Sequence, residues 1–298
     1  MSAPAYLVDA SIYIFRAYFS LPERWHSPEG YPLNAVYGYT NFLIELLGQL
    51  PQPVHLAAAF DESLGSCFRN DIYPDYKASR ELPDEALAFQ LETCRQITEL
   101  MGIPCFGGTT HEADDYIATL ASQHRGEGRS VTVVSRDKDL GQLLLEEGDR
   151  LWDYAGGNQL DRQGFHERFG VNPEQFPDYQ GLVGDSIDDI PGVPSIGAKS
   201  GALLISAFEN LEGLEPCRQD LDGLGLRGAA RISAALEEHW DQALMSRQLA
   251  RLETDTPGVS LPEPLSLGSL EALQDCLSEL GLAGPLLRRA RALAESPQ

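Results

Sequence analysis

The stretch S-V-T-V-V-S-R-D-K-D, residues 130–139, places an apolar run directly before two carboxylates, Asp137 and Asp139. Two further apolar runs also end at an acid: Y-L-V-D (6–9) at Asp9 and V-H-L-A-A-A-F-D (54–61) at Asp61. Short apolar runs that alternate with helical patterns predict βαβ units, and therefore a mostly parallel sheet with helices on both faces. Because the carboxyl ends of such strands meet at one edge, we expect these acids to share that edge.

The rest of the chain suggests how this α/β fold continues. Ile103 to Phe106 predicts a fourth strand, and the helical patterns are a stretch from Ser11, Asn34 to Leu50, 84–101 and 112–124. After Leu160 the strand signals stop, and short helices broken by Gly and Pro follow. We therefore expect an α/β domain over 1–160, an all-α domain over 161–256 and a Leu-rich helical tail over 257–298.

Acidic residues recur at strand ends and helix starts in five clusters. In a single cleft so many carboxylates could not all stay ionised without counter-charge, because like charges raise one another's pKa. Ligation by oxygen alone suits Mg²⁺ or Mn²⁺ rather than zinc, and two such ions can assist an in-line phosphoryl displacement. The candidate metal ligands are Asp9, Asp61, Glu112, Asp114, Asp115, Asp137, Asp139, Asp185 and Asp188.

Each cluster taken alone has a simpler interpretation. Glu112 and Asp115 are three residues apart, and with Asp114 they would favour the N-terminal end of a helix dipole whether or not they bind metal. Asp137 and Asp139 could be solvated acids in a turn. The occurrence of all five clusters in one α/β chain favours the metal site.

Composition excludes several classes of protein. The chain has 298 residues, no apolar run long enough to span a bilayer and no secretory pattern at its start. Its five cysteines contain no C-x-x-C pair, which argues against a disulfide framework or zinc knuckle. We expect a cytoplasmic protein. With 22 Lys and Arg against 45 Asp and Glu, the net charge is −23, so a nucleic acid would have to be held by metals and local basic patches.

The most specific local motif is G-D-S-I-D-D-I-P-G-V-P-S-I-G-A-K-S-G, residues 184–201. An apolar helix follows its glycines, and main-chain N–H groups at such a helix start can bind one phosphate of a duplex without reading bases. Lys199 adds a positive charge. The alternative is an ordinary Gly/Pro corner between two helices, and the spacing does not fit a P-loop.

The densest mixture of aromatic and basic residues is C-F-R-N-D-I-Y-P-D-Y-K-A-S-R, residues 67–80. Lys77 and Arg80 share a helical face, where cations could contact phosphates, and the tyrosines could stack on unpaired bases. A solvated loop with snorkelling side chains is the alternative.

These motifs together resemble the bacterial 5′-nucleases, the group that contains the 5′–3′ exonuclease domain of DNA polymerase I and the stand-alone flap endonucleases. The resemblance runs in register from Leu7 to about Pro257 and includes F-D-E, E-A-D-D, S-R-D-K-D and G-D-S-I-D-D. It implies a PIN-like α/β domain, an arch over about 65–83, and a helix–three-turn–helix in the all-α domain. The departures, Ala10 where Gly is common and Ser195 and Ala198 where Gly and Pro are common, remove no ligand.

The resemblance also implies roles for individual residues. Lys77 and Arg80 would be catalytic, Mg²⁺ would occupy two or more sites with Mn²⁺ as a substitute, and K⁺ would bind at the helix–three-turn–helix. The partner would be DNA with 5′ flaps or 5′ ends, or RNA primers, without a membrane, and the protein a monomer in replication or repair. The DNA contacts would be Arg16, Arg69, Tyr73, Tyr76, Lys77, Arg80, Gly192, Val193, Ile196, Gly197, Lys199 and Ser200.

Three other functions stay open at this point. A module that binds flaps without cutting would have lost a metal ligand, and none is lost. A PIN-like ribonuclease shares the acidic core but usually lacks the helix–three-turn–helix. A phosphohydrolase acting on small substrates would have no use for the arch or the second domain.

Overall fold

The computed structural model describes residues 3–51, 54–63, 65–265 and 270–295. Its chain forms two compact units. The first unit comprises Met1–Ser63, Glu81–Arg136 and Thr254–Gln298, and the second comprises Leu64–Arg80 and Asp137–Glu253. The predicted division cuts the chain into consecutive stretches. The compact units instead group most of the expected arch with the helical part of the chain, and the tail with the α/β part.

The first unit contains four parallel strands in the order β3-β2-β1-β4. Leu7 of the central strand lies opposite Ala57 on one side and Val133 on the other. The apolar runs predicted as strands are therefore confirmed, and they form a parallel sheet because helical crossovers separate them. Their bounds are Ala5–Asp9 for β1, His55–Ala59 for β2, Cys105–Phe106 for β3 and Val131–Val134 for β4.

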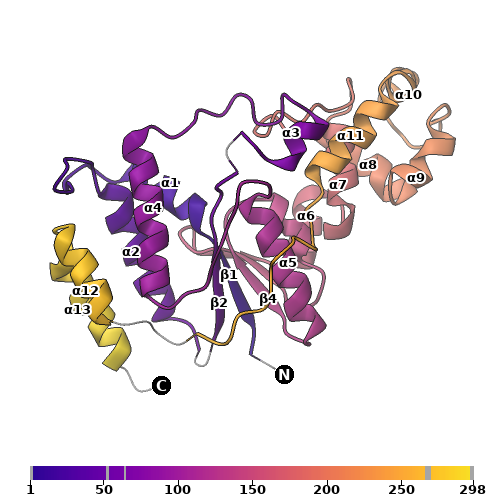
Figure 1. The fold of residues 1–298 in the computed structure, drawn as a ribbon. Coiled ribbons are helices and arrows are strands. Elements are labelled where there is room, and N and C mark those ends of the chain that lie inside the picture. Colours follow the sequence, from indigo (N-terminus) through magenta and orange to yellow (C-terminus); the bar gives the residue numbers. More distant parts are fainter. Residues whose placement is uncertain (1–2, 52–53, 64, 266–269, 296–298) are drawn as a thin grey trace. The chain divides into compact units, whose positions relative to one another are not determined.

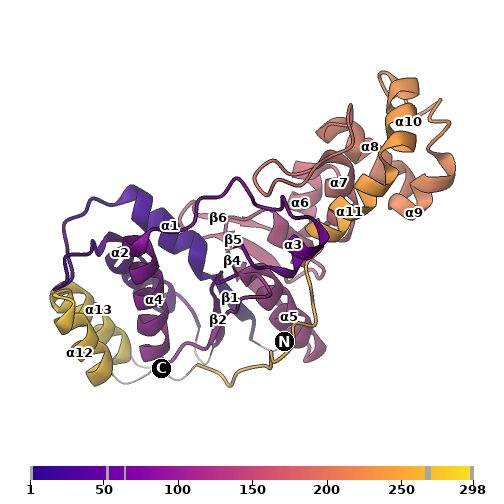
Figure 2. The same cartoon turned by 45° about the horizontal axis from the view of Figure 1, so that its top comes forward.

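Helices cover both faces of this sheet (Figures 1 and 2). α1 (Ala10–Ser20), α2 (Asn34–Leu47) and α4 (Glu85–Leu100) lie on one side, and α5 (Ala113–Gly126) lies on the other. Apolar side chains at helical spacing face the sheet, and Leu7, Val8, Ile14, Leu43 and Ile97 are at most 1% exposed. The α/β class predicted from the strand–helix alternation is confirmed.

Two helices at the end of the first unit pack against its outer helices. α12 (Leu270–Glu279) contacts α4, and α13 (Ala283–Glu295) contacts α2. Leu273, Leu277 and Leu286 are buried there. The Leu-rich tail expected from the sequence is thus a helical hairpin that contributes to the core of the first unit.

The second unit is mainly helical, with one hairpin that sequence reading missed. β5 (Arg150–Asp153) and β6 (Asn158–Leu160) pair antiparallel across a turn that contains Gly156 and Gly157. Both strands are short and only partly buried, so they lack the apolar run that identifies a buried strand. The α-helices of this unit are α3 (Phe68–Ile72), α6 (Arg162–Phe169), α7 (Phe176–Val183), α8 (Ala198–Phe208), α9 (Leu211–Leu214), α10 (Ala229–Glu238) and α11 (Trp240–Ala250). Three 3₁₀ segments, η1 (Asp139–Leu143), η2 (Pro173–Gln175) and η3 (Glu215–Cys217), complete it.

Helix length and polarity also bear on membrane insertion. Within the described part of the chain, no helix is both long enough and apolar enough to cross a bilayer.

His124 is a buried titratable group beneath the sheet of the first unit. It is 1% exposed, its ring lies edge-on to His55 with 5.4 Å between centroids, and its Nδ1 has no hydrogen-bond partner among the described residues. Burial lowers the pKa of His124 to about 4, with smaller contributions from His55 and Arg129 that Glu127 opposes. The folded protein therefore holds this imidazole neutral.

Because His124 is neutral in the folded protein, we expect the stability of the first unit to fall in acid. The pKa of His124 is lower in the folded than in the unfolded chain, so its contribution to stability is complete above the ordinary value and is lost as the pH falls towards 4. The wild-type free energy of unfolding should carry an acid-dependent part of at most about 1.4 kcal/mol per pH unit. Urea unfolding of His124→Gln between pH 7 and pH 4.5 should show a shallower pH slope. His166→Gln, at an exposed position, should keep the wild-type slope; equal slopes in all three proteins would contradict the assignment.

Candidate active site

Two of the predicted metal ligands stand at the ends of neighbouring strands in the first unit. Asp9 ends β1, where its carboxylate caps α1 through the N–H of Ile12 and accepts a hydrogen bond of 2.8 Å from Ser135 Oγ. Asp61 lies two residues beyond β2 and accepts a bond of 2.9 Å from Ser63 Oγ. Because β1 and β2 run parallel, both acids lie at the same edge of the sheet.

The acidic cluster of α5 follows β3, whose end lies at that edge as well. The main-chain N–H of Glu112 donates to Asp115 Oδ2 at 3.1 Å, as in a capping box. Glu112 and Asp115 are buried, and Asp114 is half-buried. The capping interpretation and the ligand interpretation are therefore compatible, because the cap orients acids that remain at the strand edge.

The other four predicted ligands belong to the second unit and lie next to cations of the chain. Lys138 Nζ is 3.4 Å from Asp139 Oδ1 and forms a short ion pair with Asp185. Arg80 Nη2 is 2.5 Å from Asp188 Oδ1. Asp137 accepts the main-chain N–H of Asp139 at 2.9 Å. Sequence reading regarded Lys138 only as a spacer between two acids.

A close main-chain approach forms the turn that carries Asp185 and Asp188. A Cβ on Gly184 would lie 2.4 Å from Gly192 N, and one on Gly192 would lie 2.3 Å from the carbonyl oxygen of Val183. Gly184 also has a φ of +76°, which favours glycine. These two glycines allow the turn to close, and the Asp185–Ile190 bridge joins its two sides.

Burial and crowding shift the titration of these acids. Burial, and then the charge of Asp137, raise the pKa of Asp139 to about 7 against the opposing effect of Lys138. Burial alone would lower the pKa of Lys138, but Asp139, Asp185 and Asp137 outweigh it and raise that pKa. The second unit thus concentrates negative charge that it partly neutralises itself.

The donor chemistry of these groups fits a hard divalent cation. All nine side chains offer carboxylate oxygens, which Mg²⁺ and Mn²⁺ prefer. Gln180 donates to Asp139 at 2.8 Å and to Asp185 at 3.3 Å, while its buried Oε1 has no hydrogen-bond partner among the described residues. In the parts of the chain that the structure describes, no three His, Cys, Asp or Glu side chains are gathered as a preformed metal centre.

The predicted phosphate grip lies at the start of α8. Lys199 is exposed in the first turn of this helix. Gly197 is the N-cap, and its N–H donates to Ser200 Oγ at 3.0 Å. The side chains of Val193 and Ile196 are buried, and the N–H of Val193 donates to the carbonyl of Leu182 at 2.8 Å. These two residues therefore support the turn, whereas Lys199 faces solvent.

Comparison with known proteins identifies the family of this chain. Residues 4–170 match the family described as "5'-3' exonuclease, N-terminal resolvase-like domain", and residues 171–272 match "5'-3' exonuclease, C-terminal SAM fold". The chain belongs to the 5′–3′ exonuclease family.

Curated relatives in this family include DNA polymerase I of Rhizobium leguminosarum, 37% identical over 258 residues that cover 85% of this chain and 25% of the polymerase. DNA polymerase I of Pseudomonas aeruginosa is 38% identical, with 85% of this chain and 27% of the polymerase covered. The chain thus spans about a quarter of the length of these relatives.

Solved structures share the fold at low identity. A structure of T5 5′-exonuclease with bound zinc superposes with a TM-score of 0.64 at 20% identity, and the match covers 98% of both chains. The catalytic core of Rad2 in complex with DNA substrate superposes with a TM-score of 0.65 at 14% identity, covering 99% of this chain and 92% of that one.

Ser195 has a backbone conformation that glycine usually adopts. Its φ is +72°, in the left-handed region that favours glycine. The sequence resemblance expected Gly here, and the structure keeps the glycine-like conformation although the residue is serine.

The arch segment, residues 67–80, uses two of its predicted DNA contacts for folding instead. Arg69 is 1% exposed, and its guanidinium donates to the carbonyl of Leu249 at 2.8 Å and to that of Arg251 at 3.0 Å. Tyr76 is 4% exposed and packs in an apolar cluster with Ile190 and Leu249. With these side chains buried, the predicted phosphate contact of Arg69 and base stacking of Tyr76 do not fit this structure.

The remaining predicted contacts are more accessible. Tyr73 is half-buried against the same apolar cluster, and Arg16 is exposed on α1 of the first unit. Lys77 and Arg80 both form ion pairs with Asp188 in the acidic turn. Sequence reading missed Gln180 and Ser135 because no pattern marks a single polar residue that hydrogen-bonds to a distant acid.

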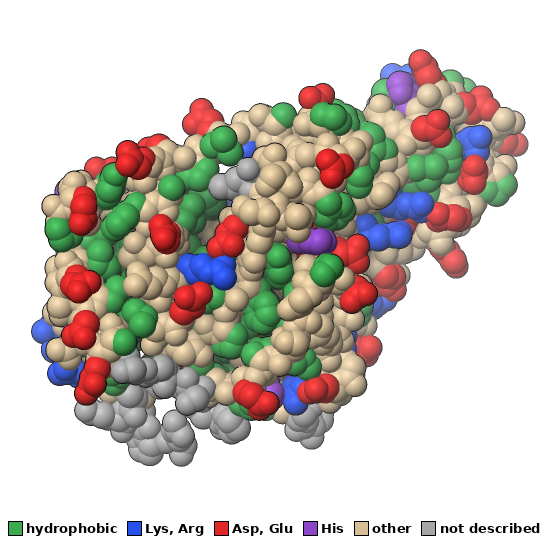
Figure 3. Space-filling model, in the orientation of Figure 1, with side chains coloured by type: hydrophobic (Ala, Val, Ile, Leu, Met, Phe, Trp, Pro, Cys, Tyr) green, Lys and Arg blue, Asp and Glu red, His purple; other side chains and the backbone are tan. Residues whose placement is uncertain are grey.

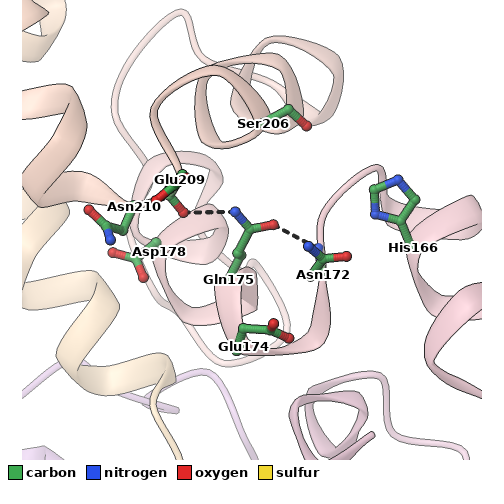
Figure 4. A pocket seen from close by; sticks show the side chains of 8 residues that line it. All are labelled: His166, Asn172, Glu174, Gln175, Asp178, Ser206, Glu209 and Asn210. Atoms are coloured by element: carbon green, nitrogen blue, oxygen red, sulfur yellow. Dashed lines mark hydrogen bonds between the residues drawn. The ribbon is translucent and has the colours of Figure 1, made fainter. Parts of the chain in front are cut away.

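The second unit also has a polar cavity that contains none of the predicted site residues. Its volume is about 550 Å³. Figure 4 shows Gln175 at its centre, bonded to the N–H of Asn172 and to the carbonyl of Glu209. The lining residues are His166, Asn172, Glu174, Gln175, Asp178, Ser206, Glu209 and Asn210.

The burial of Arg69 predicts a stability effect rather than a loss of DNA affinity alone. Arg69→Ala removes the donors for two carbonyls in a buried site, so the free energy of unfolding in urea should fall by roughly 2–5 kcal/mol. Arg95→Ala is the control, because Arg95 forms surface ion pairs with Glu62 and Glu99 and should lose less than about 1 kcal/mol. An Arg69→Ala protein of normal stability with weakened DNA binding would restore the phosphate contact.

Proposed function

We propose that this chain is a structure-specific 5′ nuclease that hydrolyses phosphodiester bonds in branched or 5′-ended DNA with divalent metal ions, Mg²⁺ first among them. The observation that carries the proposal is the complete set of nine acids in a member of the 5′–3′ exonuclease family. The zinc bound to T5 5′-exonuclease and the DNA substrate bound to Rad2 support it.

The acids of each unit would hold the metal ions. Two such ions can lower the pKa of an attacking water and stabilise the leaving oxygen. In the first unit, the hydrogen bonds from Ser135 to Asp9 and from Ser63 to Asp61 keep these carboxylates oriented. In the second unit, Gln180 orients Asp139 and Asp185 through its amide.

The cations would bind the substrate. Lys77 and Arg80 would contact the phosphate at the cleavage position, and the start of α8 with Lys199 would bind one duplex phosphate. Arg16, with an exposed side chain, would add a further contact from the first unit. K⁺ at the Gly-rich turn and activity as a monomer on 5′ flaps or RNA primers, in replication or repair, complete the proposal.

Removal of one predicted ligand tests the metal assignment. Asp114→Ala and Asp137→Ala, one in each unit, should each abolish cleavage of a labelled 5′-flap DNA in Mg²⁺ while retaining flap binding in Ca²⁺, because the duplex contacts are elsewhere. EDTA should also stop wild-type cleavage. Blunt duplex and an RNA hairpin, assayed in parallel, define the substrate: preference for the hairpin would favour a ribonuclease, and near-normal rates in either variant would refute the metal assignment.

The exposed side chain of Lys199 predicts how DNA binding depends on salt. Lys199→Ala should weaken duplex binding and reduce the slope of log affinity against log salt by about one unit, as expected for the loss of one phosphate contact. Arg288→Ala removes the same charge from an exposed position on α13 and should leave the slope unchanged. Fluorescence anisotropy between 50 and 200 mM salt would measure both; equal slopes in the two variants would contradict the contact.

A further inference from the structure

The arch segment is fastened to the acidic turn by two kinds of bond, all within the second unit. The main chain supplies one kind: Lys77 N–H donates to the carbonyl of Asp188 at 3.0 Å, and Ser79 N–H donates to Asp189 Oδ2 at 2.8 Å. Side chains supply the other, with Arg80 Nη2 at 2.5 Å from Asp188 Oδ1 and Lys77 Nζ at 3.6 Å from Asp188 Oδ2. Asp188 therefore has a cation on each of its oxygens.

These side-chain pairs are well placed to be strong. The Asp188 side chain is 12% exposed and that of Lys77 is 17% exposed, so solvent screens their attraction less than it screens a surface pair. Arg80 is more open, at 40%, and can turn outward. A metal ion bound by Asp188 would use one or both of the oxygens that Lys77 and Arg80 contact. Its positive charge beside these two cations would also weaken their attraction to Asp188.

We propose that Lys77 and Arg80 compete with a divalent cation for Asp188, so that cation binding at this acid releases both side chains to the DNA phosphate. The inference rests on the proposed metal-dependent nuclease and adds a control to it. The cations that bind substrate are held by a metal ligand, and only the arrival of the metal makes them available.

A third cation shows the same relationship. Lys138 contacts Asp139 and Asp185, two further predicted ligands, and its side chain is 34% exposed. Three cations thus lie beside the predicted metal ligands of this unit. A divalent ion could enter this group only by displacing protein cations or by adding to them, and Lys138 is a positioning residue in the same exchange.

Two hydrogen bonds from main-chain N–H groups would keep the arch segment in place during the exchange. They involve Lys77 N–H and Ser79 N–H, neither of which contacts the Asp188 carboxylate. When Asp188 changes partner, these bonds still hold the arch segment beside the turn. Lys77 and Arg80 then remain close to whatever phosphate the metal attracts.

A metal titration without DNA tests the competition directly. Arg80→Gln removes the competing charge while keeping a polar side chain, so isothermal titration with Mn²⁺ should show affinity about three- to tenfold tighter than wild type. Arg80→Lys should return towards the wild-type value. Arg162→Gln is the matched control, because Arg162 pairs with Glu174 elsewhere in the same unit and is about as exposed as Arg80. Unchanged or weaker Mn²⁺ affinity in Arg80→Gln would overturn the proposal, as would equal tightening in Arg162→Gln.

DNA binding tests the same exchange independently, because here Arg80→Gln should lose affinity rather than gain it. By anisotropy with flap DNA, Arg80→Gln should lose affinity in Ca²⁺ and match wild type in EDTA, because only the cation frees Arg80. Lys77→Gln should behave alike and serves as the second variant if Arg80→Gln fails to fold. Equal losses in Ca²⁺ and EDTA would overturn the exchange. Failure of wild type to bind Mn²⁺ or to cut the flap would instead refute the proposed function, so the two failures are distinguishable.

Discussion

Repulsion among carboxylates is the constraint on which the second unit depends. Burial and the nearby charge of Asp137 raise the pKa of Asp139 to about 7, which records the energetic cost of crowding acids in a poorly solvated place. Lys138, Lys77 and Arg80 offset that cost through their ion pairs. The turn formed by Gly184 and Gly192 holds Asp185 and Asp188 at these cations, and the arch segment supplies two of the three. The ion pairs that offset the acidic charge therefore also fix the position of the arch segment.

The first unit stabilises its acids by a different route. Hydroxyl and main-chain N–H groups donate hydrogen bonds to Asp9, Asp61 and Asp115. Hydrogen bonds to the ionised form favour it without adding positive charge. In the second unit, Asp185 and Asp188 instead form ion pairs with lysine and arginine side chains. The partners of the predicted ligands thus differ between the two units.

The proposed nuclease would have to bind a polyanion with few cations. The face drawn in Figure 3 carries many scattered carboxylates and fewer Lys and Arg side chains, in keeping with the net charge of −23. The structure reduces the available cations further, because Arg69 is buried as an anchor for the arch segment. DNA binding would then rely on a small number of phosphate contacts, which would make it sensitive to salt. The proposed release of Lys77 and Arg80 by metal would suit such a surface.

The sequence by itself determined the strand–helix alternation, the strand-end positions of Asp9 and Asp61, and the family. These follow from apolar periodicity and local motifs, which depend on neighbours along the chain. The β5–β6 hairpin escaped detection because its short, half-exposed strands carry no apolar run. Only the tertiary structure decided that Arg69 and Tyr76 are buried, that Gln180 and Lys138 contact the acids, and that Asp188 holds the arch segment. Each of these facts depends on residues far apart in sequence: Arg80 and Asp188 are separated by 108 positions, and no local pattern encodes which cation a buried carboxylate will find.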